Sequence, residues 1–272
     1  MTASSIDLTA EKIVLVRDGV RILDGLSIEA VPGKLTAIIG PNGAGKSSLL
    51  AVLSGLWAAE GGTVRLGGRD IHSFSPTERA KRCAVMRQDN PRPAGLTVLE
   101  SVALGRAATG ATAAREKAWS VLEQTGLMAI ADRDCARLSG GEWQRVAFAR
   151  SLVQIAGTEP RGVLLLDEPV SNLDPVHQHH VLVAARRLAG NGHTVLTVLH
   201  DLNLTRQYAD HVLLVKAGRV EGSGPASETM RPETLSALYE CPVARVRDKD
   251  TDLDALVTLP SDADPHNGLP KP

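Results

Sequence analysis

The sequence predicts an α/β protein built around a parallel β-sheet. Two short runs of consecutive apolar residues, at 35–39 and 163–166, are typical of strands that are buried on both faces, as in a parallel sheet covered by helices. A glycine-rich loop follows the first run and leads into a helix-like segment. After residue 163, strand-like and helix-like segments alternate along the chain, which is the arrangement from which α/β folds are built.

The first elements are predicted from alternating and continuous apolar patterns. Apolar and polar residues alternate from 13 to 29 around the turn-like pair Asp18-Gly19, which predicts two antiparallel strands. The predicted order is this strand pair, a buried strand at 35–39, a helix from 46 to about 56, and a hairpin at 63–66 with Gly67-Gly68 at its turn. No strong strand is predicted between this hairpin and residue 163.

The rest of the chain is predicted to be helical first and then mixed. Residues 98–154 are mostly helix-like. They are followed by predicted strands at 163–166, 194–199 and 211–215, with helices at 176–188 and 202–208 between them. Residues 249–272 are rich in Asp and Pro and poor in apolar residues, which predicts a loosely attached tail.

The composition excludes several classes of protein. With 272 residues, of which 43% are hydrophobic, the chain can bury a full core as one domain. A formal net charge of −1 does not suit a nucleic-acid-binding surface, so no nucleic acid is expected as a partner. No apolar run approaches the roughly 20 residues of a spanning helix, and the N-terminus lacks the pattern of a secretory signal. We therefore expect the chain in the cytosol, where it contacts a membrane only through another protein.

The cysteines agree with this expectation. Cys83, Cys135 and Cys241 are scattered and form no C-x-x-C pair. A disulfide framework or a structural zinc site is therefore not expected.

A phosphate-binding loop is predicted between the strand at 35–39 and the helix that begins near Lys46. The loop fits G-x-x-x-x-G-K-[ST] and has the strand before it and the helix after it that this motif requires; a glycine-rich turn with a solvated lysine would need all three to coincide by chance. Glycines let backbone N–H groups wrap a phosphate closely, and the helix N-terminus adds its dipole. Lys46 is expected to reach the β- and γ-phosphates of ATP, and the Ser47 hydroxyl is expected to bind Mg²⁺. The expected nucleotide-binding residues are Gly40, Pro41, Asn42, Gly43, Ala44, Gly45, Lys46, Ser47 and Ser48.

Two adjacent acids end the predicted strand at 163–166. In open α/β sheets, ligands bind at the carboxyl ends of the strands. Asp167 is therefore expected to hold Mg²⁺, directly or through water, across from Ser47. Glu168 is the candidate general base for the attacking water. An apolar strand that ends in Asp-Glu is by itself also typical of a simple turn, and its combination with the phosphate loop favours the chemical roles.

A second glycine-containing segment, Leu138-Ser139-Gly140-Gly141-Glu142, precedes a helix-like stretch. Ser139 and Glu142 fit the S-x-x-E pattern of a helix capping box, so a purely structural helix start is one interpretation. A helix N-terminus opened by glycines is also an anion site, additional to the one at Lys46.

With this segment, the sequence resembles the ABC transporter ATPases. LSGGE is the signature of that family, and it lies between the phosphate loop and the acidic strand, as in the family. The resemblance covers roughly residues 6–245 and implies a P-loop NTPase core with a small antiparallel β lobe and a helical signature lobe at about 96–155. It also implies ATP and Mg²⁺ as ligands and a homodimer in which Ser139, Gly140 and Gly141 of each copy bind the nucleotide of the other.

The resemblance implies roles for further residues. Gln88 resembles the family's Q-loop glutamine, a metal contact that also senses the transmembrane partner. Asp174 ends a segment that resembles the D-loop and is expected at the nucleotide site. His200 resembles the switch histidine that contacts the γ-phosphate, although a histidine at a strand end is by itself more often structural. The family often stacks an aromatic residue on adenine where this chain has Val16-Arg17, and the Arg17 guanidinium is the candidate to cover the base.

Among these ATPases, the sequence is most similar to subunits of importers for haem, siderophore-bound iron and cobalamin, and among those to haem importers. The segments that carry this similarity are 102–106, 156–162, 174–179 and 199–204. The similarity implies two transmembrane permease subunits as partners, a periplasmic substrate-binding protein that acts indirectly, and a peripheral position on the cytoplasmic face of the inner membrane. A ferric siderophore or cobalamin is the alternative cargo.

Three histidines, His177, His179 and His180, invite a metal-ligand interpretation. No acid or cysteine completes a ligand set, and His179 is expected to point away from the other two on a helix. A polar helix surface or a subunit contact is the favoured interpretation.

Two other functions were weighed against a transport ATPase. A soluble ABC protein of DNA repair or translation would carry coiled coils or zinc modules between the phosphate loop and the signature, or two ATPase units in one chain. Residues 46–139 offer no heptads and no cysteine pairs. An adenylate-type kinase needs no LSGGE. The sequence therefore favours the transport ATPase.

Overall fold

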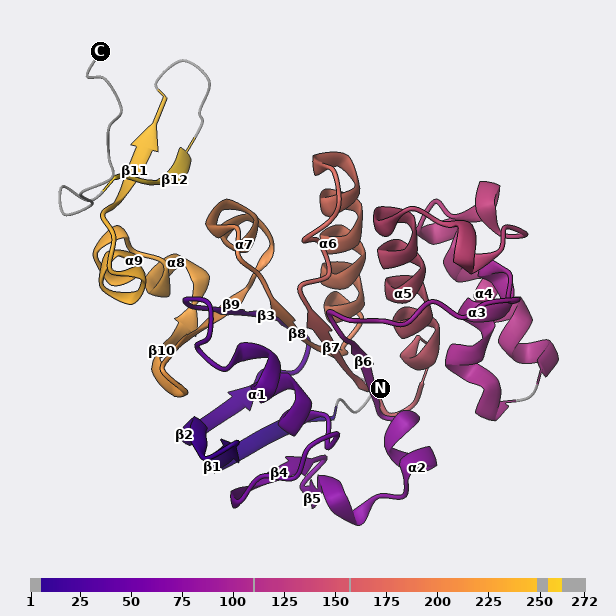
Figure 1. Ribbon diagram of the computed structural model, residues 1–272, viewed down its shortest axis with the longest axis horizontal. Coiled ribbons are helices and arrows are strands. Elements are labelled where there is room, and N and C mark those ends of the chain that lie inside the picture. The colour runs from indigo at the N-terminus through magenta and orange to yellow at the C-terminus, as the bar shows by residue number, and fades with distance from the viewer. Residues whose placement is uncertain (1–5, 110, 157, 249–253, 261–272) are drawn as a thin grey trace.

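The computed structural model describes residues 6–109, 111–156, 158–248 and 254–260. A six-stranded sheet forms the centre, a four-stranded sheet lies beside helix α1 (Lys46–Leu53), and a two-stranded sheet lies at the C-terminal end (Figure 1). None of the helices in the described part of the chain is long and apolar enough to cross a membrane.

The central sheet has the strand order β10-β9-β3-β8-β7-β6. All neighbouring strands are parallel except β10, which pairs antiparallel with β9 at the edge. The bounds are β3 Leu35–Ile39, β6 Cys83–Met86, β7 Val163–Asp167, β8 Thr194–Val198, β9 His211–Lys216 and β10 Arg219–Pro225. Every residue of β3, β7 and β8 is buried. The predicted parallel sheet with strands buried on both faces is confirmed.

Strand β6 corrects the expectation that no strong strand lies between the hairpin at 63–66 and residue 163. β6 has only four residues, of which Val85 alone is β-branched and none is aromatic, and Ala is depleted in strands, so the local strand signal is weak. Its extended conformation is stabilised by parallel pairing of residues 83–86 with residues 163–166 of β7. A tertiary contact thus makes a strand of a segment with a weak local signal.

The four-stranded sheet has the order β2-β1-β4-β5 and is antiparallel. Its strands are β1 Leu8–Arg17, β2 Val20–Ala30, β4 Gly61–Leu66 and β5 Arg69–Asp70. Asp18 and Gly19, with φ of 51° and 75°, form the turn between β1 and β2. Such positive φ values suit Gly and are tolerated by Asp, and the predicted antiparallel pair is confirmed.

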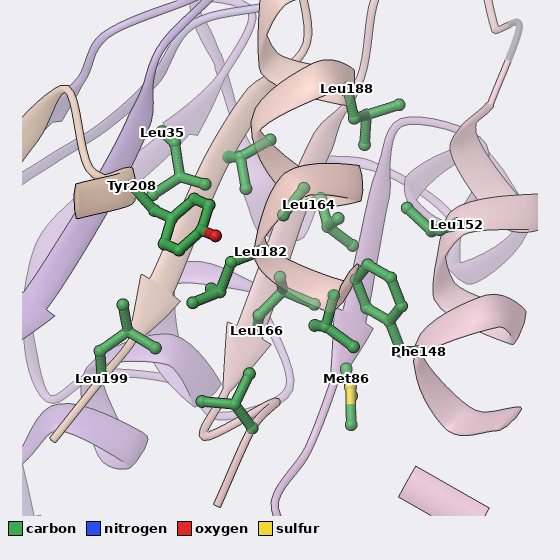
Figure 2. Close-up of a cluster of buried hydrophobic side chains, with 14 of the residues drawn as sticks. Leu35, Met86, Phe148, Leu152, Leu164, Leu166, Leu182, Leu188, Leu199 and Tyr208 are labelled. Atoms are coloured by element: carbon green, nitrogen blue, oxygen red, sulfur yellow. The ribbon is translucent and has the colours of Figure 1, made fainter. Parts of the chain in front are cut away.

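The two faces of the central sheet pack against different partners. Ile38 of β3 belongs to a core shared with α1 and the antiparallel sheet. Its neighbours Ala37 and Ile39 belong to a second core, because successive side chains of a strand point to opposite faces. This second core includes residues of α5 (Gly140–Ile155), α6 (Pro175–Gly190) and α7 (Leu202–Tyr208), and Figure 2 shows part of it around Leu164, Leu166 and Leu182.

Helices dominate the segment for which the sequence predicts a helical lobe. The helices there are α3 Val98–Ala103, α4 Ala111–Gln124 and α5, with 3₁₀ helices at 104–109, 128–130 and 135–137, while α2 (Pro76–Ala80) and a 3₁₀ helix at 71–73 precede them. Helices α3, α4 and α5 lie at one side of the molecule, beyond β6 (Figure 1). Capping boxes at Thr97 and Ser139 begin α3 and α5, because each pairs a hydroxyl acceptor with a glutamate three residues later.

The C-terminal part of the chain corrects the predicted loosely attached tail. After α8 (Ala226–Thr229) and α9 (Pro232–Tyr239), β11 (Val243–Arg247) pairs antiparallel with β12 (Asp254–Thr258). The Asn203 side chain of α7 donates to the Leu256 carbonyl and accepts from its N–H, at 3.1 and 2.8 Å. The prediction was wrong for residues 254–258, since long-range contacts order a polar segment; residues 249–253 and 261–272 lie outside the described part.

Candidate functional site

The loop between β3 and α1 closely approaches neighbouring backbone. A Cβ at Gly40, where φ is 155°, would lie 1.9 Å from the Val215 carbonyl oxygen, and one at Gly45, where φ is 95°, would lie 2.9 Å from that of Ile22. Only glycine fits such positions. Lys46 is buried, and its Nζ donates to the carbonyls of Gly40 and Pro41, at 2.7 and 2.8 Å. Burial lowers the pKa of Lys46, and its ammonium lies inside the curve of the loop, where an anion's charge would offset the cost of burial.

Ser47 and Asp167 lie side by side at the end of the central sheet. The Ser47 Oγ donates to the Asp167 Oδ1 at 3.0 Å. Asp167 is 7% exposed. Burial raises the pKa of its carboxyl above the usual value, while the hydrogen bond from Ser47 opposes that shift. A hydroxyl and a carboxylate are the oxygen donors that Mg²⁺ prefers, so the residues present fit this ion.

Glu168 meets two residues from distant parts of the chain. Its Oε2 accepts a hydrogen bond from Gln88 Nε2 at 3.2 Å, and its Oε1 lies 2.7 Å from His200 Nε2. Gln88, Glu168 and His200 follow the carboxyl ends of β6, β7 and β8, which are neighbours in the sheet. Parallel strands end at the same edge, and this topology brings the three side chains together.

Gln144 is a contact of Glu168 that the sequence reasoning missed. It lies in α5, and its Nε2 donates to the Glu168 carbonyl at 2.8 Å, while its Oε1 accepts from the Asn172 N–H at 3.3 Å. One signal was available in the sequence. Gln144 follows Gly140 by four residues, so both lie on one face of a helix that begins at the predicted signature loop.

The Ser139 loop is not brought to the phosphate loop of the same chain. Ser139 and Gly140 are exposed, and within the described residues no hydrogen bond joins residues 139–141 to residues 40–48. The capping-box interpretation is confirmed in geometry, since Ser139 Oγ accepts from the Glu142 N–H at 3.2 Å and Glu142 Oε2 accepts from the Ser139 N–H at 2.8 Å. Asp174 is also at the surface and caps α6 by accepting from the His177 N–H at 3.0 Å.

A groove of about 190 Å³ extends from the Ser47–Asp167 pair to the end of α1. Gln88 lines it together with its neighbours Arg87 and Asp89 and with the partly exposed side chains Leu56 and Trp57. The guanidinium of Arg17, the candidate to cover adenine, lies 4.7 Å from the centre of the Trp57 ring. The groove thus joins the acidic end of the sheet to an apolar surface.

The three histidines of α6 do not converge on one point. His177 stacks on His180 with ring centres 5.9 Å apart. His179 instead places its Nδ1 2.6 Å from the hydroxyl of Tyr208. No group of three or more His, Cys, Asp or Glu side chains suited to a metal is found in the part of the chain that the structure describes.

Comparisons with known proteins agree with this geometry. The model of the family described as "ABC transporter" matches residues 23–171. The hemin import ATP-binding protein of Agrobacterium fabrum is 43% identical, with 85% of this chain and 90% of that protein covered. Its counterpart in Pseudomonas entomophila is 42% identical, with coverages of 85% and 92%.

Solved structures resemble the chain as well. An ATP-binding cassette of an ABC transporter in its ADP conformation superposes with a TM-score of 0.72 and 28% identity, covering 85% of this chain and 97% of that chain. A nucleotide-free cassette gives a TM-score of 0.71 and 28% identity, with coverages of 86% and 94%. The family match spans more than half of the chain, and relatives above 40% identity span most of it. The chain belongs to the ABC transporter family as one of its ATP-binding and ATP-hydrolysing subunits.

Proposed function

We propose that this chain hydrolyses ATP to power haem uptake through a permease dimer in the inner membrane. The observation that carries the ATPase part is the meeting of Gln88, Glu168 and His200 beside the Ser47–Asp167 pair. The names of the relatives, which import hemin, carry the cargo part. Both agree with an ATPase that works at the cytoplasmic face of the membrane through its partners.

The phosphates of ATP occupy the loop at residues 40–48. Backbone N–H groups of the loop and the start of α1 point toward them. Lys46 exchanges its contacts with the Gly40 and Pro41 carbonyls for phosphate oxygens. Such an exchange suits a buried ammonium, which gains a full negative charge in place of two carbonyl dipoles.

Ser47, Gln88 and Asp167 would hold Mg²⁺, because their hydroxyl, amide and carboxylate all offer oxygen. When bound there, the ion would supply positive charge to neutralise the phosphates. Gln88 has a second function here, because its amide also contacts Glu168. Loss of the γ-phosphate can therefore change the position of Gln88, at the beginning of the loop that follows β6.

Glu168 removes the proton from the attacking water. Its carboxylate is held from both sides by Gln88 and His200, and it is only 16% exposed. A base held in one orientation raises the rate, since the water must be deprotonated as it attacks. His200 is placed to contact the γ-phosphate from the neighbouring strand end.

Two copies complete each site. Ser139, Gly140 and Gly141 at the start of α5, of which the first two are exposed, bind the nucleotide that the partner copy holds. The exposed Asp174 lies at the same contact between the copies. An exposed helix N-terminus with free N–H groups is suited to the γ-phosphate of another molecule.

A cytoplasmic helix of the permease docks beside residues 88–98, which join β6 to the helical lobe, and reaches the groove that Gln88 and Asp89 line. Leu56 and Trp57, which are 52% and 37% exposed, offer apolar contact near the end of the groove. Gln88 lies at the other end, beside the metal site. The periplasmic substrate-binding protein acts on this chain only through the permease.

Reconstitution with the permease tests this function. We expect ATP hydrolysis that is slow for the chain alone and stimulated in the full complex by binding protein loaded with haem. A ferric siderophore and cobalamin serve as the comparison cargoes. Stimulation or uptake with either of them, and none with haem, would overturn haem as the cargo and leave the ATPase assignment intact.

A further inference from the structure

The backbone of Glu168 adopts a conformation that a glutamate rarely takes. Its φ is 49°, in the left-handed region, where a Cβ makes unfavourable contacts with its own backbone. Residues in this region persist only where surrounding contacts hold them, and they concentrate at active sites. The contacts that hold Glu168 therefore bear on where its carboxylate points.

Three donors converge on the carbonyl oxygen of Glu168. The shortest hydrogen bond comes from Gln144 Nε2, at 2.8 Å, and the others come from Ser171 Oγ at 3.2 Å and the Ser171 N–H at 3.4 Å. The two bonds from Ser171 are local to the turn. Gln144 alone among these donors reaches the turn from another element, the helix α5.

Gln144 also holds the segment that follows Glu168. Its Oε1 accepts from the Asn172 N–H at 3.3 Å, and its Nε2 lies 3.4 Å from Ser171 Oγ. One side chain thus binds two backbone groups of residues 168–172. A Cβ on Gly141 would lie 3.1 Å from the Asn172 carbonyl oxygen, so the first turn of α5 packs directly against this segment.

We propose that Gln144 is a positioning residue for hydrolysis, which holds the backbone of Glu168 from the helix that begins with the Ser139 loop. The proposal rests on the proposed function, in which Glu168 is the base and Ser139 of the same copy binds the partner's nucleotide. Gln144 then links the Ser139 loop to Glu168. When the Ser139 loop docks on the partner's nucleotide, a shift of α5 moves the backbone of Glu168 in the chain's own site. Rigid helices transmit such shifts to residues packed on them.

Two substitutions at Gln144 separate its two contacts. Gln144→Met keeps the length of the side chain and removes both hydrogen bonds. Gln144→Glu keeps the acceptor for Asn172 and removes the donor to Glu168. We expect each to lower kcat by about 10-fold, the effect of losing one well-placed hydrogen bond, with the KM for ATP nearly unchanged.

Gln154→Met is the matched control. Gln154 lies on the same helix and, like Gln144, binds two backbone groups of another segment, here by donating through Nε2 to the carbonyls of Ala80 and Cys83, at 2.8 and 3.1 Å. These contacts are far from Glu168 in the fold, at the other end of β6. If Gln144 acted only on stability, both variants would lower the melting temperature alike and leave kcat alike.

Mixed dimers locate the effect. Lys46→Ala in the first chain silences the site that contains the phosphate loop of that chain. The remaining site consists of Lys46 and Glu168 of the second chain and the Ser139 loop of the first. Gln144→Met in the second chain should then lower kcat about 10-fold, as in the uniform dimer, and in the first chain should leave kcat nearly unchanged. A loss confined to the first chain, or equal in both arrangements, would overturn the positioning of Glu168.

The same measurements separate this inference from the proposed function. Full hydrolysis by the unaltered chain with an unchanged kcat in both Gln144 variants would overturn the positioning role alone. No hydrolysis by the unaltered chain, alone or with its permease, would overturn the proposed function and this inference with it.

Discussion

At the scale of single residues, Glu168 combines a strained backbone with a fully engaged side chain. Its carboxylate contacts Gln88 and His200, and its carbonyl contacts Gln144. Each of these contacts restricts the direction in which the carboxylate points. A base that is oriented before the reaction spares the free energy of ordering it in the transition state.

Glu168→Gln should therefore separate binding from hydrolysis. The amide has the shape of the carboxylate and accepts no proton, so we expect hydrolysis to fall by about 10² to 10⁴, the usual contribution of a general base. Lys46 and the loop still hold ATP, and the affinity for ATP should be nearly intact. Size-exclusion chromatography should show a dimer that persists with ATP.

Glu78→Gln is the control for this variant, because glutamine also satisfies a capping box and Glu78 lies in α2, outside the turn at Glu168. It should leave hydrolysis close to that of the unaltered chain. Equal losses of ATP affinity and turnover in Glu168→Gln would contradict the role as a base and make Glu168 a structural residue.

At the scale of elements, the start of α5 combines a helix cap with an exposed surface in the same few residues. Ser139 caps the helix and is exposed, while Gly141 lets the first turn approach Asn172. The cap satisfies N–H groups that a helix start leaves free. Ser139 and Gly140 are exposed, so under the proposed function another copy would present a phosphate to this helix start.

Ser139→Arg should abolish hydrolysis without loosening ATP from the chain's own loop. Under the proposed function, the substitution places bulk and charge where the partner's γ-phosphate would dock, whereas Lys46 would hold ATP within the same chain. ATP affinity measured on a single chain should change little, and the ATPase activity of the dimer should collapse. A mixed dimer in which one chain carries Ser139→Arg and the other Lys46→Ala should retain one competent site, because both changes then fall in the same site.

Ser75→Arg is the matched control for the lost cap. Ser75 forms the same kind of capping box at α2, away from the strand ends that carry the site. Loss of either cap should destabilise the fold by about 1 kcal/mol, but only Ser139→Arg should stop hydrolysis. No activity in the mixed dimer would contradict the sharing of nucleotides between copies, because sites that are not shared would each carry one of the two changes.

At the scale of the whole molecule, the C-terminal hairpin is attached to the core by a cluster of charges. The carboxylate of Asp254 in β12 accepts hydrogen bonds from Arg245 of β11 and Arg206 of α7. These two arginines, in that order of effect, hold the pKa of Asp254 well below its ordinary value of 3.8. The hairpin is thereby tied to the helix that follows His200.

Asp254→Asn should loosen this attachment. The amide retains shape but loses the negative charge that the guanidinium groups of Arg206, Arg245 and Arg247 share, so amide hydrogen exchange in 243–247 and 254–258 should become faster at neutral pH. Asp24→Asn is a matched control, since Asp24 of β2 is also paired with more than one arginine, Arg21 and Arg219. Unchanged exchange in the hairpin of Asp254→Asn would contradict the role of this cluster.

The charge cluster at Asp254 also makes the stability of the hairpin's attachment depend on pH. Because the folded pKa of Asp254 is depressed, its contribution is fully present above the unfolded value of 3.8 and is lost as the pH falls through the folded pKa. Hydrogen exchange in the hairpin, corrected for the intrinsic rate, should therefore stay constant from neutral pH down to about pH 4 and rise only below it. Loosening between pH 7 and pH 5 would show that another group holds the hairpin.

The sequence by itself determined the features whose signal is local. The loop at 40–47, the buried strands at 35–39 and 163–166 and the capped start of α5 each depend on neighbours within a few residues. A loop that wraps phosphate needs glycine at given spacings, and a strand covered on both faces needs a continuous apolar run. These patterns were sufficient for the α/β fold and for the family resemblance.

Only the tertiary structure decided which distant residues meet. Strand order places the ends of β6, β7 and β8 side by side and so assembles Gln88, Glu168 and His200, while the packing of α5 brings Gln144 to the Glu168 carbonyl. Strand β12 likewise depends on contacts with α7 and β11. None of these contacts leaves a periodic pattern in its own segment, because each joins residues that are far apart in the chain and is stable only when both partners are already folded.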